Sequence, residues 1–319
     1  MTALLDAQDL AKTFGNGVRA VQNVSLQVAA GETLGIVGES GCGKSTTAKM
    51  LLRLLQPDSG SVSFDGVDVN RMTRGQLREL RRRLQVVPQN PQTSLNPRLT
   101  VRQSLEFNLR VHGVARAGRR RRVDDLLDRV GLDPTYGDRH PHAMSGGQLQ
   151  RAAIARALTT EPELVICDEA VSALDKSVQA QVLNLLADLQ RDLGLAFVFI
   201  SHDLAVVEHI ADRVAVMYLG RVVEQGPAET LWRDARHPYT ITLLSSTPGA
   251  ERARITLRGE LPSPADPPSG CGFRTRCPVA TADCATEWPA LTIRQSDHLV
   301  SCIHDRPRLE AVAPATRSA

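Results

Sequence analysis

The sequence predicts an α/β protein with a parallel core sheet, an antiparallel β layer, a helical subdomain and a small loop-rich C-terminal tail. Strand-like and helix-like hydrophobic runs alternate between residues 164 and 218, the pattern typical of a parallel sheet flanked by helices. A glycine-rich turn at residues 38–43 joins an apolar strand to a helix. Past residue 247 prolines and cysteines accumulate, and we therefore expect two domains, residues 1–247 and 248–319.

The expected elements follow one another along the chain. Residues 3–35 alternate apolar and polar side chains around a glycine break at residues 15–17, which predicts an antiparallel hairpin. A strand is expected over Thr33–Val37, and a helix from Lys44 to about residue 55. The pattern then turns helical and rich in arginine, with a helical subdomain at about residues 90–160. Later strands are expected at residues 164–167, 197–200 and 214–218, and helices at residues 178–193 and 204–210.

Composition argues against nucleic-acid binding and against a membrane span. Of the 319 residues, 38 are basic and 35 acidic, and this near balance gives a net charge of only +3. Arginine runs at residues 78–83 and 116–122 lie among helical hydrophobic repeats, so we interpret them as solvated helix faces. No apolar run reaches the roughly 18–20 residues that cross a bilayer. The N-terminus lacks the basic and apolar regions of a signal peptide, so we expect the chain to stay in the cytoplasm.

The strongest local signal is the octapeptide Gly-Glu-Ser-Gly-Cys-Gly-Lys-Ser at residues 38–45, which fits the pattern G-x-x-x-x-G-K-S. Glycines allow backbone N–H groups to turn inward around phosphate oxygens, and the positive end of the following helix assists them. Lys44 would reach the β- and γ-phosphates, and the Ser45 hydroxyl would hold Mg²⁺. A chance glycine turn is the alternative, yet only four lysines occur in the chain. The nucleotide-binding residues expected here are Gly38, Glu39, Ser40, Gly41, Cys42, Gly43, Lys44, Ser45 and Thr46.

A second motif ends an apolar strand with two carboxylates, Asp168 and Glu169. Charge is tolerated at the end of a buried strand because a cation can meet it there. Asp168 is expected to hold Mg²⁺ through its water shell. Glu169 is expected to orient and deprotonate the attacking water, since phosphoryl transfer depends on positioning and charge neutralisation. The pair is a weak signal alone and a strong one beside a phosphate-binding loop.

The segment Met-Ser-Gly-Gly-Gln at residues 144–148 opens a predicted helix some 20 residues before Asp168. A Ser-Gly-Gly backbone at a helix start is a second anion-binding nest. One chain has little use for two phosphate cradles per nucleotide. We therefore expect the second cradle to close on ATP held by another subunit, through Ser145, Gly146, Gly147 and Gln148.

In this order the motifs resemble the nucleotide-binding domain of ABC transporters, over about residues 4–245. The resemblance implies a P-loop ABC ATPase that binds ATP and Mg²⁺. It implies that Phe14 stacks on adenine, that Gln89 senses Mg²⁺ and the pore subunit, and that His202 lies near the γ-phosphate. Residues 172–175 would pass between subunits. From the residues alone, the alternatives are Phe14 as core filler, Gln89 as a surface polar residue and His202 as a strand-end cap.

Three positions depart from the family pattern. Met144 stands where leucine is usual, and Ala170-Val171 stand where Pro-Thr is usual. None of these changes removes a phosphate contact or a catalytic group. The resemblance therefore implies a competent ATPase, with Glu169, His202 and Gln89 as catalytic residues.

Further phrases resemble the peptide and nickel importers of this family, at residues 87–97, 172–182 and 237–240. The tail cysteines resemble those of the same importers, in which four thiolates hold a [4Fe–4S] cluster. Their spacing, C-x5-C-x6-C-x17-C, lacks the tight pairs of most zinc sites, and disulfides are disfavoured in a reducing cytoplasm. Zinc and unligated thiols stay open as alternatives. The expected cluster ligands are Cys271, Cys277, Cys284 and Cys302.

The resemblance implies an ATPase that drives import of di- or oligopeptides from the cytoplasmic face of the membrane. The implied partners are a second ATPase subunit, identical or paralogous, two transmembrane permease subunits and, indirectly, an extracytoplasmic substrate-binding protein. The alternatives are the ATPase of an exporter and that of a nickel or glutathione importer. A non-transport ABC ATPase acting on ribosomes or DNA usually carries two cassettes or a long coiled-coil insertion, and neither is visible in this sequence.

Overall fold

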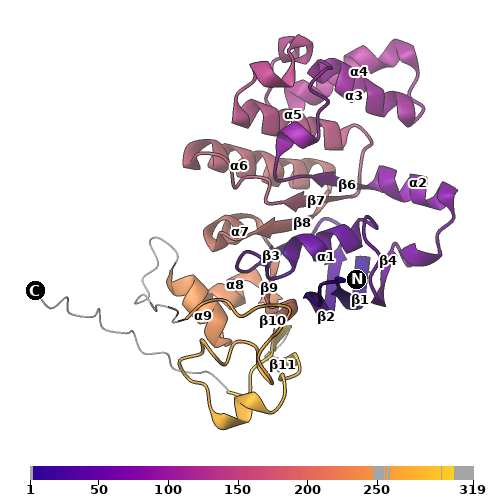
Figure 1. Ribbon diagram of the computed structural model, residues 1–319. Helices are drawn as coiled ribbons and strands as arrows, with labels where there is room; N and C mark the ends of the chain where they lie inside the picture. The colour runs from indigo at the N-terminus through magenta and orange to yellow at the C-terminus, as the bar shows by residue number, and fades with distance from the viewer. Residues whose placement is uncertain (1–2, 247–254, 256, 258, 296, 305–319) are drawn as a thin grey trace, which may run out of the picture.

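The computed structural model describes residues 3–246, 255, 257, 259–295 and 297–304. Its strands are β1 Ala3–Thr13, β2 Arg19–Ala29, β3 Thr33–Val37, β4 Ser59–Phe64, β5 Val67–Asp68, β6 Leu84–Val87, β7 Leu164–Asp168, β8 Ala196–Ser201, β9 Arg213–Tyr218, β10 Arg221–Pro227, β11 Thr292–Gln295 and β12 His298–Val300. They form two sheets (Figure 1). The larger sheet has the order β11-β12-β10-β9-β3-β8-β7-β6, and the smaller has the order β2-β1-β4-β5.

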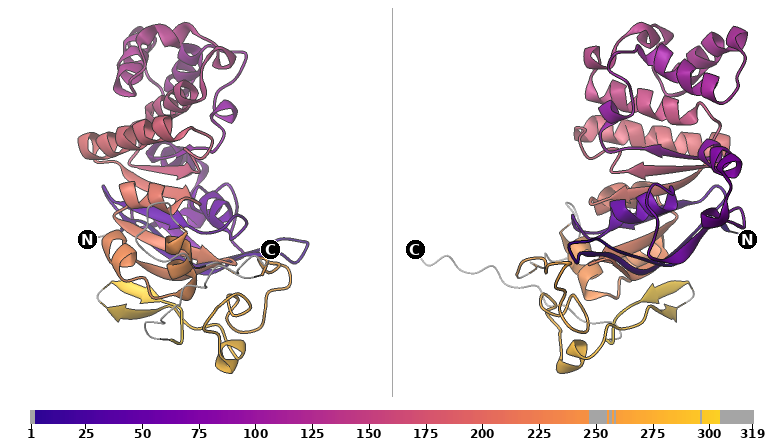
Figure 2. Two further views of the ribbon diagram at one scale, coloured as in Figure 1. Left: turned by 90° about the vertical axis from the view of Figure 1, so that its left-hand side faces the viewer. Right: turned by 45° about the vertical axis from the view of Figure 1, so that its right-hand side comes forward.

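The helices of the described residues are α1 Lys44–Leu51, α2 Arg74–Arg83, α3 Val101–Val111, α4 Arg116–Arg129, α5 Gly146–Leu158, α6 Lys176–Leu193, α7 Leu204–Ile210, α8 Ala228–Arg233 and α9 Pro238–Ser245. Helices α3, α4 and α5 gather at one end of the molecule, and residues 259–295 and 297–304 lie at the opposite end (Figures 1 and 2). Among the described residues, no helix combines the length and apolar character that a membrane span requires.

The centre of the larger sheet is parallel. β3 pairs in parallel with β8 and β9, and β7 pairs in parallel with β6 and β8. Every residue of β3 and β8 is buried, as expected for strands that are covered on both faces. The predicted strand at Thr33–Val37 and the alternation of strands and helices after residue 164 are confirmed. Because these strands are parallel, the carboxyl ends of β3, β7, β8 and β6 meet at one edge of the sheet.

The antiparallel layer predicted near the N-terminus is confirmed. β1 pairs antiparallel with β2 and with β4. Its buried side chains share one hydrophobic cluster with Leu34 and Ile36 of β3, so the smaller sheet packs on the core of the larger one. This packing brings Ala20 of β2 close to the loop that follows β3.

Several elements differ from the prediction. The helix that begins at Lys44 ends at Leu51 and not near residue 55, because Arg53 adopts a left-handed conformation with φ +52°. β6 lies within the stretch that was predicted to be helical. It is a strand because parallel pairing with β7 overrides the helical pattern of its sequence. The tail supplies β11 and β12, which no pattern predicted, and β12 pairs antiparallel with β10. The sheet is therefore mixed and not purely parallel.

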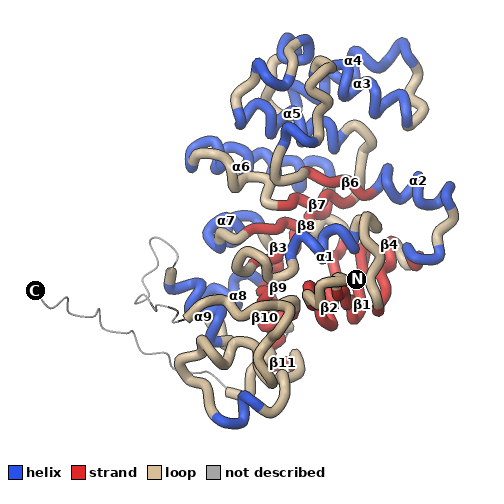
Figure 3. Tube along the Cα trace, viewed as in Figure 1, coloured by secondary structure: helices blue, strands red, loops and turns tan. Residues whose placement is uncertain are grey.

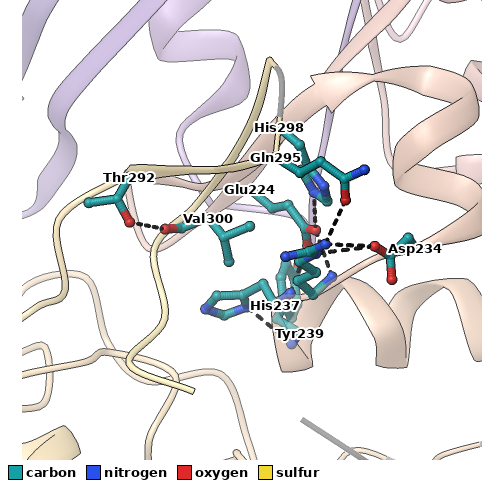
Figure 4. A network of polar contacts seen from close by, with 9 residues as sticks. Glu224, Asp234, His237, Tyr239, Thr292, Gln295, His298 and Val300 are labelled. Carbon is teal, nitrogen blue, oxygen red and sulfur yellow. Dashed lines mark hydrogen bonds and ion pairs between the residues drawn. The ribbon is translucent and has the colours of Figure 1, made fainter. Parts of the chain in front are cut away.

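A buried polar network holds the tail against the core (Figure 4). Glu224 of β10 is fully buried, and its carboxylate accepts hydrogen bonds from the backbone N–H groups of Arg236 and His237, at 2.7 and 2.9 Å. His298 of β12 places its Nε2 atom 2.7 Å from the same carboxylate. A buried carboxylate needs several donors of this kind. The network thus joins β10, the start of α9 and a tail that otherwise consists mainly of loops (Figure 3).

Candidate nucleotide-binding site

The phosphate-binding loop lies between β3 and α1, where the sequence predicted it. Gly38 and Gly43 have φ values of +153° and +108°, which L-amino acids with side chains rarely adopt. A Cβ atom on Gly38 would lie 2.2 Å from the carbonyl oxygen of Met217, and one on Gly43 would lie 2.3 Å from that of Ala20. The β9 and β2 backbones therefore leave no room for side chains at these positions, and the loop shape depends on both glycines.

Lys44 is buried at the start of α1, and its ammonium group points back over the loop. Its Nζ atom donates hydrogen bonds to the carbonyl oxygens of Gly38, at 2.7 Å, and Glu39, at 3.0 Å. Only 5% of Lys44 is exposed. The ammonium group is therefore held within the loop and is not free to move in solvent. A lysine that binds phosphate needs a fixed position of this kind.

The two residues expected to hold Mg²⁺ lie together. The Ser45 hydroxyl donates to Asp168 Oδ1 over 3.1 Å, although the two residues are 123 positions apart. Burial raises the pKa of Asp168, the Ser45 hydrogen bond opposes this shift, and the neighbouring Glu169 carboxylate adds to it. A bound divalent cation would favour the charged form of this carboxylate and offset its burial.

The three residues predicted to be catalytic also converge. Gln89, two residues after β6, donates from Nε2 to Glu169 Oε2 over 2.8 Å. His202, directly after β8, has its Nδ1 atom 3.5 Å from Glu169 Oε1. Glu169 itself has φ +49°, and its N–H donates to the Ile200 carbonyl over 3.0 Å. A non-glycine residue in this conformation is strained, and such strain is concentrated at functional sites.

The second cradle, residues 145–148, begins α5 in the helical subdomain. The Ser145 hydroxyl accepts from the Gln148 N–H over 3.4 Å, and the Gln148 side chain accepts from the Ser145 N–H over 3.1 Å. This reciprocal capping fixes the helix start. A Cβ atom on Gly147 would lie 2.5 Å from Val178 Cγ1, so the helix packs closely on α6. Within the described residues, no hydrogen bond joins this segment to the phosphate-binding loop.

Phe14 does not fill the core, and that alternative is wrong. Its side chain lies in the turn between β1 and β2 and is 40% exposed. Exposure of a large aromatic side chain is compatible with base stacking, which stays a prediction. Cys42 and Cys167 are fully buried, and burial raises the pKa of both thiols, for Cys167 to about 12. Both thiols therefore stay protonated near neutral pH, as expected for small structural residues.

The tail cysteines line one small cavity together with His237 and His304. None of the four is paired in a disulfide, and burial raises the pKa of Cys271 to about 11 and that of Cys277 to about 12. In residues 3–304, apart from the undescribed gaps, no group of three or more His, Cys, Asp or Glu residues is arranged to hold a metal ion. The predicted metal-binding character of the tail, through Cys271, Cys277, Cys284 and Cys302, is therefore not confirmed.

Two residues that contact the loop were missed by the sequence analysis. The Tyr239 hydroxyl accepts a hydrogen bond from the Glu39 N–H over 2.9 Å, and Arg276 forms an ion pair with the Glu39 carboxylate. Tyr239 belongs to a phrase that was noticed only as a family resemblance, and Arg276 directly precedes Cys277. Their separation from Glu39, by 200 and 237 positions, leaves no local signal of these contacts.

The comparisons with known proteins agree with this geometry. A family model described as "ABC transporter" matches residues 21–172, and one described as "Oligopeptide/dipeptide transporter, C-terminal region" matches residues 223–284. The probable peptide ABC transporter ATP-binding protein y4tS of Sinorhizobium fredii is 52% identical over 290 residues, which cover 89% of this chain and 82% of that protein. The oligopeptide transport ATP-binding protein AppF of Bacillus subtilis is 49% identical over 293 residues, 89% of each chain.

Solved structures show the same fold. The chain is similar to cbiO1 of Clostridium perfringens, part of the ABC transporter complex cbiONQ, with a TM-score of 0.68, 30% identity and coverage of 73% of this chain and 92% of that one. It is also similar to the dimeric bacterial ABC transporter cassette MJ0796, with a TM-score of 0.64, 30% identity and coverage of 70% and 98%. The chain therefore belongs to the ABC transporter family, carries the C-terminal region of its oligopeptide/dipeptide transporters, and is an ATPase.

Proposed function

We propose that this ATPase drives the import of di- or oligopeptides through a membrane ABC transporter. The observation that carries the proposal is the joint match of both chain regions: the ATPase core and the C-terminal region match the same group of peptide transport proteins over most of their length. The convergence of Ser45, Asp168, Gln89, Glu169 and His202 at one sheet edge supports the hydrolytic part of the proposal. An exporter ATPase is not favoured, because the match extends into the C-terminal region.

In this proposal, the backbone of residues 38–46 and Lys44 bind the phosphates, and Phe14 stacks on the adenine ring. Ser45 and Asp168, with Gln89 close by, would hold Mg²⁺, which neutralises phosphate charge when bound. Glu169 orients the attacking water and accepts its proton. Gln89 and His202 fix the Glu169 carboxylate through the contacts described above. Because this carboxylate is held in place, it would orient a water molecule well.

We further propose that the active form is a pair of ATPase subunits at the cytoplasmic face of the membrane. Ser145, Gly146, Gly147 and Gln148 of one subunit would close on the nucleotide that residues 38–46 of the other subunit hold. The similarity to a dimeric cassette supports this arrangement. The complete transporter would contain two permease subunits and receive its cargo from an extracytoplasmic binding protein. Nucleic acid is not among the proposed partners, since the chain has a net charge of only +3.

Uptake assays test the proposed transport function. A strain that lacks this chain is expected to lose uptake of labelled di-, tri- and tetrapeptides. The wild-type chain should restore uptake, and the Lys44→Ala variant should not, because it lacks the phosphate-binding ammonium group. Assays with labelled Ni²⁺ and glutathione serve as matched controls. If the strain that lacks this chain lost Ni²⁺ or glutathione uptake and kept peptide uptake, the proposal would be contradicted. The same holds if that strain retained a compound that the wild-type strain exports.

We also propose that residues 248–319 form a C-terminal extension to a nucleotide-binding domain of residues 1–247, and that its cysteines hold a [4Fe–4S] cluster. Four thiolates are the donor set of such a cluster, and Cys271, Cys277, Cys284 and Cys302 line the same cavity. A cluster would keep these thiols ionised despite their burial. The proposal requires the cysteines to approach one another more closely than in the described structure, since they do not form a metal-binding group there.

Metal analysis tests the cluster directly. Anaerobically purified protein is expected to contain about four iron atoms per chain and to absorb light at about 400 nm. The Cys277→Ser variant should lose both signals. The Cys167→Ala variant, which removes a buried thiol outside the cavity, should keep them. Stoichiometric zinc, or protein without metal, would contradict the cluster and leave the ATPase assignment intact.

A further inference from the structure

Glu39 of the phosphate-binding loop is held by residues that lie far outside the loop. The Arg276 guanidinium donates from Nη1 to Glu39 Oε2 over 2.6 Å, and from Nη2 to Glu39 Oε1 over 3.0 Å. Two parallel bonds of this kind fix the direction as well as the strength of an ion pair. Only 7% of the Arg276 side chain and 26% of the Glu39 side chain are exposed, so solvent screens this pair less than a surface pair.

An aromatic cluster of three buried rings contacts Arg276 through Tyr218. Phe273 of the tail packs against Tyr218 at the end of β9 and Tyr239 of α9, with ring centroids 5.3 and 5.4 Å apart. Arg276 Nη1 also lies 3.4 Å from the Tyr218 hydroxyl. Tyr239 in turn bonds the Glu39 backbone. The side chain and the backbone N–H of Glu39 are therefore both bound by one continuous cluster that the tail completes.

Charge gives this contact a consequence for nucleotide binding. Glu39 contributes a carboxylate to the loop in which the negatively charged triphosphate of ATP would bind. An unpaired carboxylate there would repel the phosphates and would weaken the effect of the Lys44 ammonium group. The bidentate contact with Arg276 neutralises that carboxylate. The neighbouring Glu39 carboxylate also raises the pKa of the Arg276 guanidinium, so this positive charge persists at all physiological pH values.

We propose that Arg276 of the C-terminal tail is a positioning residue of the nucleotide site, which neutralises Glu39 and fixes the phosphate-binding loop for ATP. The inference rests on the proposed role of residues 38–46 as the phosphate cradle. It assigns to the tail a part in ATP binding that acts through Glu39. The tail and the loop thus form a single unit, although 237 residues separate Arg276 from Glu39.

A mutant cycle on the full-length protein tests the proposal. The Arg276→Met variant is expected to bind ATP about tenfold more weakly, because it leaves the Glu39 carboxylate unpaired beside the triphosphate. Its KM for ATP should rise by the same factor while kcat changes less than about twofold, since no group that contacts the reacting atoms is lost. In a Glu39→Gln background the same substitution should have little effect, within about twofold, because the repelling charge is gone. Rescue of this kind distinguishes charge neutralisation from a purely structural role.

Arg274 provides the matched control. It lies two residues from Arg276 and bonds the carbonyl oxygen and hydroxyl of Ser269, not the loop. The Arg274→Met variant should bind ATP like the wild type. The Arg276→Lys variant, which keeps the charge and loses the bidentate geometry, should lie between the wild type and Arg276→Met. If Arg276→Met does not fold, as judged by thermal unfolding, Arg276→Lys in both backgrounds decides the question.

The Lys44→Ala variant distinguishes failure of the proposed Arg276 role from failure of the proposed nucleotide site. If Lys44→Ala abolishes ATP binding and Arg276→Met does not weaken it, the role of Arg276 is wrong and the nucleotide site stands. If Lys44→Ala binds ATP normally, the proposed cradle itself is wrong. Equal weakening by Arg276→Met with and without Glu39→Gln would overturn charge neutralisation and indicate a packing defect of the tail.

Discussion

The Glu169→Gln variant is expected to bind ATP with nearly unchanged affinity and to hydrolyse it about 10²–10⁴-fold more slowly. Glutamine preserves the size of the side chain and can still interact with Gln89, but it cannot accept the proton of the attacking water. The left-handed backbone at Glu169, with φ +49°, would hold the amide at the position of the carboxylate. Single-turnover measurement of phosphate release, together with the Kd for ATP, would separate the chemical step from binding.

Glu163→Gln is the matched control for this prediction. Glu163 directly precedes the first residue of β7, at the other end of this strand from Glu169. Its carboxylate forms a surface ion pair with Arg83, over 2.5 Å. The same acid-to-amide change there should alter kcat by less than about twofold, since surface ion pairs contribute little. A Glu169→Gln variant that retained more than about a tenth of the wild-type kcat would exclude Glu169 as the general base.

The Gly43→Ala variant is expected to lose both stability and ATP binding. A non-glycine residue in this left-handed conformation costs about 1–2 kcal/mol of stability. The added methyl group would lie 2.3 Å from the Ala20 carbonyl oxygen, and relief of such a clash by backbone movement costs about 1–3 kcal/mol more. Movement of the loop would also misplace Lys44, and a displacement of about 1 Å can cost about 10²-fold in activity. Chemical denaturation and equilibrium ATP binding would measure the two effects.

Gly66→Ala controls for conformational strain alone. Gly66 has φ +73° in the turn between β4 and β5, and no atom lies within 4 Å of a Cβ built there. Its substitution should cost about 1 kcal/mol of stability and leave ATP affinity unchanged. If Gly43→Ala behaved like Gly66→Ala, the close approach of β2 to the loop would not determine nucleotide binding.

Sequence alone predicted the parts of the site that depend on local chemistry and on strand direction. Residues 38–45 carry their own conformational requirement, because glycines supply the left-handed positions. Ser45 and Asp168 could be brought together because the carboxyl ends of parallel strands meet at one edge. The same rule brings His202, which directly follows β8, to this edge, where its Nδ1 atom lies 3.5 Å from Glu169 Oε1. The alternation of strands and helices after residue 164 indicates the parallel direction that these contacts need, whereas the order of the strands comes from the structure.

The elements that were missed depend on non-local pairing. In β6, Leu84 continues a helical repeat of Leu77 and Leu80, so the local pattern favours a helix, and only the parallel pairing with β7 makes it a strand. The contact between Arg276 and Glu39 depends on how the tail folds over β9 and α9, which no periodicity records. The four cysteines line a single cavity. Their spacing alone did not predict this, and the expectation came from the family resemblance.

The pairing of β12 with β10 also affects how the folded chain resists association with other chains. Without β12, β10 would present unpaired backbone groups along a largely buried strand, and such edges are templates for aggregation. The edge that the tail presents instead is β11, a strand of four exposed residues that includes Arg294, which is short and polar. During synthesis, the β10 edge stays open until residues 298–300 have left the ribosome. Truncation before β12 is therefore a hazard for solubility as well as for the nucleotide site.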